Sequence, residues 1–253
     1  MNPHPPSSDE RDPSSNDAAS RHPHRIRAMF SAIAGRYDFG NHLLSANVDR
    51  WWRRRAAEVL VSPESRRLLD VCCGTGDLAL ACARRAPRAE AIIGCDFAEP
   101  MLHIARAKAA RSRARAPRLD FVSADATALP FPDGGFDAAG VAFGLRNLAD
   151  RLTGLREMAR VVRPGGRVLV LEFSTPPNRL ARALYLFYFQ RLLPRIARIA
   201  TGSRDYNYLP ASVAGFPPPE TLAAMMRGAG LCDVRFDLLT GGIAAIHIGR
   251  KPG

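Results

Sequence analysis

The chain has 253 residues, of which 47% are hydrophobic and 24% charged, a globular composition that fits one large domain or two smaller ones. We expect no membrane-spanning helix, since there is no uncharged apolar run of about 18 residues, and no metal site, since the five cysteines lack zinc-type spacing. The net charge is +12, carried by 34 arginines and two lysines. Such a charge favours an anionic membrane surface or nucleic acid as partner, unless the arginines are spread over a solvated surface.

Residues 1–24 are rich in Pro, Ser, Asp and Asn, so we expect a disordered tail without an inferred function. From Arg25 on, apolar residues recur at helical spacing, and a second helix is expected at 48–60. Together, residues 25–62 are predicted to form a helical cover on a domain that spans 25–253.

Short apolar segments then alternate with helical ones, which predicts parallel βαβ units with helices on both faces of a sheet. The expected strands are 67–72, 91–95, 119–123, 136–142 and 167–173, and the expected helices are 77–85, 100–115 and 152–162. A further helix at 219–230 precedes two strands at 233–239 and 243–250, which Gly241-Gly242 would join as an antiparallel hairpin.

Residues 176–210 interrupt this alternation. They hold an apolar and aromatic run at 184–189, and their six arginines face a single acid, which gives a net charge of +5. We interpret the segment as a surface that meets lipid headgroups and an apolar ligand tail. A buried lid or a dimer helix is the alternative.

The loop Gly74-Thr75-Gly76 follows a predicted strand and opens a predicted helix. It fits the GxGxxA dinucleotide fingerprint, with Asp96 placed 20 residues after Gly76 to hold ribose hydroxyls. By itself, this motif also describes an ordinary tight turn between a strand and a helix.

Charge indicates which ligand the loop would bind. Asp70, Asp77, Asp96 and Asp125 all lie at or just after the carboxyl ends of predicted strands. Four carboxylates favour a cation over a pyrophosphate, and S-adenosylmethionine carries a sulfonium and an ammonium but no phosphate. Asp70 would face the ammonium, Asp96 the ribose, and Asp125-Ala126 the adenine edge. Alternatively, Asp70 and Asp77 only cap the chain.

The segment from Asp70 to Gly76 resembles the first motif of class I S-adenosylmethionine-dependent methyltransferases. More specifically, the chain resembles the ubiquinone/menaquinone biosynthesis C-methyltransferases. The segments that carry this resemblance are 29–38, 74–77, 125–131, Phe143-Gly144-Leu145-Arg146-Asn147, 163–166, 172–174, Tyr208-Leu209-Pro210 and Phe216-Pro217.

The resemblance implies an α/β, Rossmann-like fold: a seven-stranded, mostly parallel sheet with an antiparallel last strand. It also implies methyl transfer to a ring carbon of a prenylated quinol, with demethylmenaquinol favoured and a ubiquinone precursor as the alternative. The cofactor contacts that it implies are Thr75, Asp96, Asp125 and Ala126. Cys72 and Ala142 depart from the family pattern, because many relatives have Gly or Ala at the first position and Ser at the second.

Methylation of carbon requires a phenolate-like quinol. Arg146 can stabilise that anion, but it stays protonated and is a poor base. We therefore expect Arg146 to stabilise the phenolate and Asn147 to position it. Tyr37 is expected on the cofactor side of the helical cover. The candidate proton acceptors are Asp38, Asp205, Tyr206 and His247.

Two alternatives remain. A nucleic-acid methyltransferase would suit the basic charge, but the chain lacks a Pro-Cys nucleophile and an Asn-Pro-Pro-aromatic turn, so no nucleic acid is expected as partner. The other alternative is a non-catalytic binding protein of the same fold. We expect a cytoplasmic protein. Two further points stay open: peripheral contact with an anionic membrane, and formation of a homodimer.

Overall fold

Seven strands form one sheet in the order β3-β2-β1-β4-β5-β7-β6 in the computed structural model, which describes residues 47–112, 118–188, 191 and 212–253. The strands are β1 (Arg67–Val71), β2 (Ala91–Asp96), β3 (Arg118–Ser123), β4 (Phe136–Ala142), β5 (Val162–Phe173), β6 (Cys232–Leu239) and β7 (Ala244–Arg250). Only β7 runs against its neighbours, β5 and β6. This confirms the predicted sheet with an antiparallel last strand.

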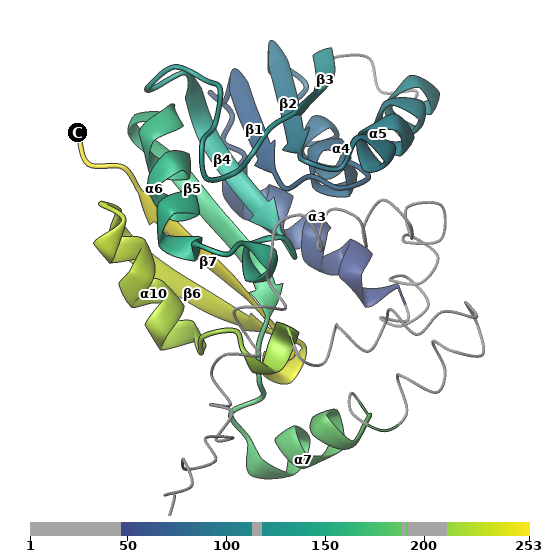
Figure 1. Cartoon of the computed structure of the whole chain (residues 1–253), viewed down its shortest axis with the longest axis vertical. Coiled ribbons are helices and arrows are strands. Elements are labelled where there is room, and N and C mark those ends of the chain that lie inside the picture. Colours follow the sequence, from purple (N-terminus) through teal and green to yellow (C-terminus); the bar gives the residue numbers. More distant parts are fainter. Residues whose placement is uncertain (1–46, 113–117, 189–190, 192–211) are drawn as a thin grey trace, which may run out of the picture.

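Helices cover both faces of the sheet (Figure 1). One face carries α3 (Val48–Leu60), α4 (Asp77–Ala83) and α5 (Glu99–Arg111), and the other carries α6 (Arg151–Val161) and α10 (Pro219–Gly228). Two short 3-10 turns, η1 (Leu145–Asn147) and η4 (Thr240–Gly242), follow β4 and β6.

The apolar strands are buried on both sides, as expected for a parallel sheet between two helical layers. On β1, Leu68 packs with α3 and α4, whereas its neighbour Leu69 packs with α6. Gly140 of β4 allows α3 to approach closely, since a Cβ there would lie 2.8 Å from Cδ2 of Leu60. The backbone of β4 thus supports the helix next to the site described below.

Within the described residues the predicted elements are present, and two of them differ by more than two residues from their expected bounds; the helix expected after Arg25 lies outside the described residues. β5 begins at Val162 instead of residue 167, because Gly165 and Gly166 exchange backbone hydrogen bonds with Lys251 and so extend the pairing. α5 ends at Arg111 instead of residue 115, where Ser112 turns to extended backbone.

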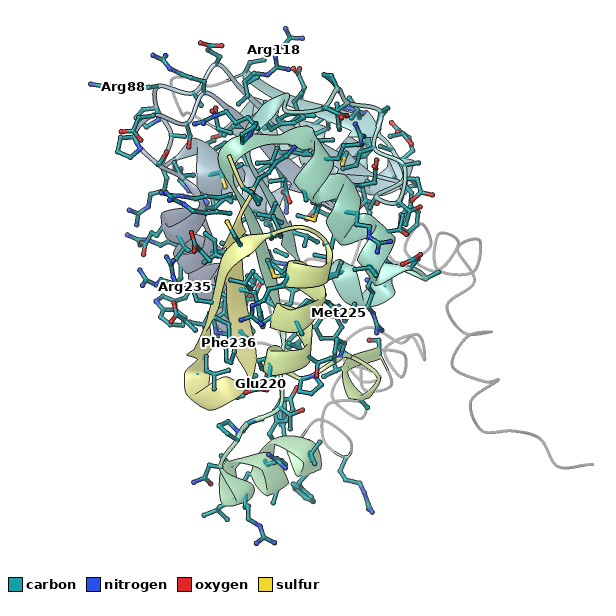
Figure 2. The ribbon with its side chains drawn as sticks, turned by 90° about the vertical axis from the view of Figure 1, so that its left-hand side faces the viewer. Arg88, Arg118, Glu220, Met225, Arg235 and Phe236 are labelled. Atoms are coloured by element: carbon teal, nitrogen blue, oxygen red, sulfur yellow. The ribbon has the colours of Figure 1, made fainter. Side chains whose placement is uncertain are left out.

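α7 (Arg179–Phe187) lies apart from the two helical layers at the bottom of Figure 1. It lies equally clear of the sheet and α10 in the turned view of Figure 2. Within the described ranges, no helix is long and apolar enough to cross a bilayer.

Candidate functional site

A cleft opens at the carboxyl ends of β1, β2 and β4, and about 620 Å³ of empty space, part of it open solvent, lies within it. Open α/β sheets bind their ligands at this edge. The lining residues are Arg53, Asp70, Cys72, Cys73, Gly74, Thr75, Asp77, Leu78, Asp96, Phe97, Met101, Ala142, Phe143, Gly144, Asn147 and Leu148.

The glycine loop has a shape that other residues would not adopt. Gly74 and Gly76 have φ angles of +53° and +81°, and a Cβ on Gly76 would lie 2.9 Å from the Phe121 ring. The backbone N–H of Gly74 donates to Oδ2 of Asp96 (2.9 Å), and the N–H of Ala98 donates to Oδ1 of Asp96 (2.9 Å). Asp96 therefore joins the loop to the end of β2, and burial raises the pKa of its carboxyl group.

Asp70 has an unsatisfied carboxylate oxygen. Its side chain is only 3% exposed, and Oδ2 accepts the N–H of Ala79 at 2.8 Å. Oδ1 is buried and has no hydrogen-bond partner among the described residues. Burial raises the pKa of Asp70 to about 8; the Ala79 hydrogen bond and Arg53 oppose this rise, and the carboxylates of Asp96 and Asp77 add to it.

Asp77 and Thr75 are tied to α5 by one lysine. Nζ of Lys108 donates to Oδ1 of Asp77 (2.7 Å) and to Oγ1 of Thr75 (2.9 Å). The negative charge of Asp77 is thus balanced inside the protein. Lys108 was not expected from the sequence, because no spacing rule links the last turn of one helix to the first turn of another.

Three of the four expected carboxylates line the cleft, and Asp125 does not. Its side chain is exposed, and Oδ1 accepts both the N–H and the hydroxyl of Thr127 in a local turn. Ala126 is buried in the core on the α6 side, and it does not line the cleft either. Their predicted contact with adenine therefore remains a prediction.

Arg146 does not line the cleft, whereas Asn147 does. The Arg146 guanidinium is buried, with Nη1 3.1 Å from Oε2 of Glu172 and 2.5 Å from the carbonyl oxygen of Phe143. Its backbone N–H also donates to Glu172. The cation expected to stabilise a phenolate therefore has an internal carboxylate partner, which the sequence analysis did not assign.

Phe143 lines the cleft and packs against two aromatic rings behind it. The ring of Phe143 lies 4.7 Å from that of Phe173 and 5.9 Å from that of Trp52, and the guanidinium of Arg53 lies 5.0 Å from its centroid. Phe143 has a φ of +60°, a strained value that clusters at functional sites. Arg53, which lines the cleft, was missed as a site residue, because helical spacing identifies a buried face without showing what it faces.

Cys72 and Ala142, the two departures from the family pattern, both line the cleft. Cys72 also has a positive φ of 52°, and Gly144 packs directly on it, since a Cβ on Gly144 would lie 2.4 Å from Cβ of Cys72. Burial raises the pKa of Cys72 well above its ordinary value, so this thiol stays protonated and serves as neutral lining of the cleft.

The remaining candidates lie elsewhere. Tyr37, Asp38, Asp205 and Tyr206 fall outside the described residues. His247 is buried on β7, where its Nε2 lies 2.9 Å from the carbonyl oxygen of Pro219 at the start of α10, and it does not line the cleft.

The hydrogen-bond acceptors of the cleft fit a ligand that is both cationic and rich in hydroxyl groups. The unpartnered oxygen of Asp70 can accept from an ammonium, and Asp96 retains lone pairs for hydroxyl groups. Phe97 and Met101 supply apolar lining for a flat ring. S-adenosylmethionine carries all three groups, so the residues present fit it. Within the described ranges, no cluster of His, Cys, Asp or Glu could hold a metal ion.

The chain is similar to several known proteins. The model of the ubiE/COQ5 methyltransferase family matches residues 18–251. A demethylmenaquinone methyltransferase of Thermus thermophilus is 52% identical over 88% of this chain and 100% of its own length. A ubiquinone/menaquinone biosynthesis C-methyltransferase of Geobacter sulfurreducens is 49% identical over 90% of this chain and 88% of its own. A solved S-adenosylmethionine-dependent methyltransferase of Thermotoga maritima shares the fold, with a TM-score of 0.62, 20% identity, and coverage of 88% of this chain and 98% of that one.

Proposed function

The chain belongs to the ubiE/COQ5 methyltransferase family, and we propose that it methylates a ring carbon of a prenylated quinol, with demethylmenaquinol as the preferred acceptor. Relatives that carry the name demethylmenaquinone methyltransferase support this acceptor. Relatives named for both quinones keep the ubiquinone precursor as the second candidate. The observation that carries the proposal is the unpartnered Asp70 oxygen in a cleft beside the glycine loop.

We assign the cofactor end of the cleft to β1 and β2. S-adenosylmethionine supplies a methyl group that its sulfonium activates. Asp70 would accept from the ammonium, the backbone of Gly74 and Thr75 would border the amino-acid part, and Asp96 would hold the ribose. These groups are held in place before binding by the Asp96–Gly74 and Lys108–Thr75 hydrogen bonds, so little ordering is needed.

We assign the acceptor end to the turn after β4. Asn147 lines the cleft and would orient a quinol hydroxyl, and Arg146 would favour the phenolate from behind it. Tyr185 of α7 shows the reach of this charge: burial raises the pKa of its phenol, and Arg146 acts in the opposite direction.

A transfer assay with labelled S-adenosylmethionine tests the acceptor. We expect label on demethylmenaquinol, weaker or no labelling of the demethylated ubiquinone precursor, and none on RNA or DNA. Asn147→Ala should lower kcat by roughly 10- to 100-fold through misplaced substrate. Label on nucleic acid alone, or full activity of Asn147→Ala, would contradict the assignment.

We further propose that the enzyme is cytoplasmic and meets an anionic membrane through α7. Leu180, Leu184 and Phe187 recur at helical spacing and are 71%, 64% and 58% exposed. Arg179 and Arg182 are exposed beside this stripe, which is the arrangement of an interfacial helix. A quinol with a long prenyl tail is held by the same membrane.

Vesicle flotation tests this contact. Leu184→Asp should reduce flotation with anionic vesicles, whereas Leu238→Asp, at an exposed leucine on edge strand β6, should leave it unchanged. Added salt should weaken binding of the wild-type chain, because the arginines contribute electrostatically. Equal flotation of both variants would contradict the role of α7, and a concentration-dependent dimer lost in Leu184→Asp would assign the stripe to a second copy of the chain.

A further inference from the structure

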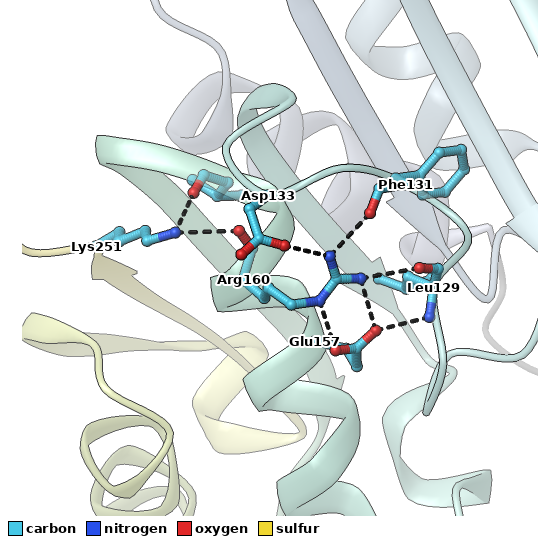
Figure 3. A network of polar contacts seen from close by, with 7 residues as sticks. Leu129, Phe131, Asp133, Glu157, Arg160 and Lys251 are labelled. Carbon is cyan, nitrogen blue, oxygen red and sulfur yellow. Dashed lines mark hydrogen bonds and ion pairs between the residues drawn. The ribbon is translucent and has the colours of Figure 1, made fainter.

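One guanidinium holds the connection between β3 and β4 (Figure 3). Nε and Nη2 of Arg160 bind the two carboxylate oxygens of Glu157 at 2.7 and 2.9 Å. Nη1 donates to the carbonyl oxygen of Phe131 (2.8 Å) and to Asp133 (2.6 Å), and Nη2 also donates to the carbonyl oxygen of Leu129 (2.9 Å). Five contacts thus match the five N–H donors of an arginine.

Glu157 completes this arrangement, which we call the Glu157–Arg160 clamp. Its Oε2 accepts the backbone N–H of Leu129 at 2.8 Å, so the clamp holds both backbone polar groups of that residue. The side-chain hydrogen bond from Arg160 lowers the pKa of Glu157, which keeps the carboxylate ionised. The carbonyl oxygen of Arg160 also accepts from the N–H of Gly134 (3.0 Å) and from Nζ of Lys251 (3.0 Å).

The same connection carries Asp125 and Ala126, the residues assigned to the adenine edge. Its first residue, Ala124, donates its N–H to the carbonyl oxygen of Asp96 (3.1 Å). A Cβ on Gly154 of α6 would lie 3.8 Å from the carbonyl oxygen of Ala126. β2 therefore holds the connection before residue 125, and α6 borders it from Gly154 to the clamp.

We propose that the Glu157–Arg160 clamp positions Asp125-Ala126 for the adenosine part of the cofactor. Neither Glu157 nor Arg160 lines the cleft. They are therefore positioning residues, which act through the connection between β3 and β4. A lysine at 160 would keep the charge but could not span two carboxylate oxygens and two carbonyls. The inference rests on the proposed function, because it needs the cofactor to lie along this edge.

Arg160→Lys tests the clamp, with Arg156→Lys as the matched control, since Arg156 is exposed on the same helix. Binding is measured by calorimetry with S-adenosylmethionine and with 5′-methylthioadenosine, which lacks the amino-acid part. We expect Arg160→Lys to bind both ligands roughly 10-fold more weakly, with KM for the cofactor raised and kcat at saturation retained. Arg156→Lys should bind both ligands like the wild-type chain.

Glu157→Gln is the second variant, in case Arg160→Lys does not fold. It keeps an acceptor for the Leu129 N–H. It should also weaken the binding of both ligands, by a smaller factor than Arg160→Lys does. Unchanged binding of 5′-methylthioadenosine by a folded clamp variant would overturn the inference alone. Failure of the wild-type chain to bind S-adenosylmethionine would overturn the proposed function and the inference with it.

Discussion

Replacement of Asp70 by asparagine is expected to weaken the binding of S-adenosylmethionine strongly. The variant keeps an acceptor for the N–H of Ala79 but removes the negative charge that would meet the ammonium. A hydrogen bond between charged partners in a buried site contributes more than one between neutral groups. Calorimetry should therefore show a loss of at least roughly 100-fold in affinity, which corresponds to about 2.7 kcal/mol.

The same substitution should stabilise the free protein at alkaline pH. The pKa of Asp70 is about 8 in the folded chain and ordinarily 3.8, so the folded state keeps a proton that the unfolded state has lost. The stability due to this proton is fully present below pH 3.8 and is lost as the pH rises through about 8. Between pH 5 and pH 9 the loss is on the order of 4 kcal/mol, and Asp70→Asn should not show it.

The affinity of the wild-type chain for S-adenosylmethionine should rise with pH, whereas the stability of the free chain falls. A cation favours the ionised carboxylate, so affinity should rise up to roughly tenfold per pH unit as the pH approaches 8. Proton release on binding can be measured by calorimetry in two buffers that differ in ionisation enthalpy. Asp237→Asn, at an exposed acid on β6, is the control and should change neither quantity. A pH-independent affinity, or tight binding by Asp70→Asn, would contradict the role of Asp70.

The elements that build the cleft could be predicted because their signals are local. The spacing of apolar residues predicted helix 48–60 with the bounds of α3. Strand β1 ends at Val71, next to Asp70, and β2 ends at Asp96, so the carboxylates meet where parallel strands end together. Such patterns can be read from the sequence, because they depend on which residues are apolar and on the direction of the chain.

The partners of the side chains could not be predicted, because they depend on packing between distant segments. Asp125 lies just after the end of β3, as Asp96 lies at the end of β2, yet its side chain binds Thr127 instead of lining the cleft. Arg146 and Glu172 are 26 residues apart and meet only because β4 and β5 are adjacent in the sheet. No periodicity or motif on one segment reports such a contact.

The pairing of Arg146 with Glu172 gives the second prediction with a large effect. Both side chains are almost fully buried, with 6% and 1% exposed. Removal of one partner from a buried ion pair leaves the other charge uncompensated and costs about 3–5 kcal/mol. Arg146→Met and Glu172→Met should each lower the free energy of unfolding in urea by about that amount.

The double variant Arg146→Met/Glu172→Met separates stability from catalysis. Replacement of a whole buried pair by apolar side chains of similar size is often neutral, so the double variant should recover most of the lost stability. Its kcat should stay low by roughly 100- to 1000-fold, because the positive charge that favours the phenolate is still absent. If Arg146 had only a structural role, the double variant would recover both its stability and its kcat. That result would show that Arg146 only supports the turn before Asn147. If the rate stays low in a stable protein, the charge itself is required.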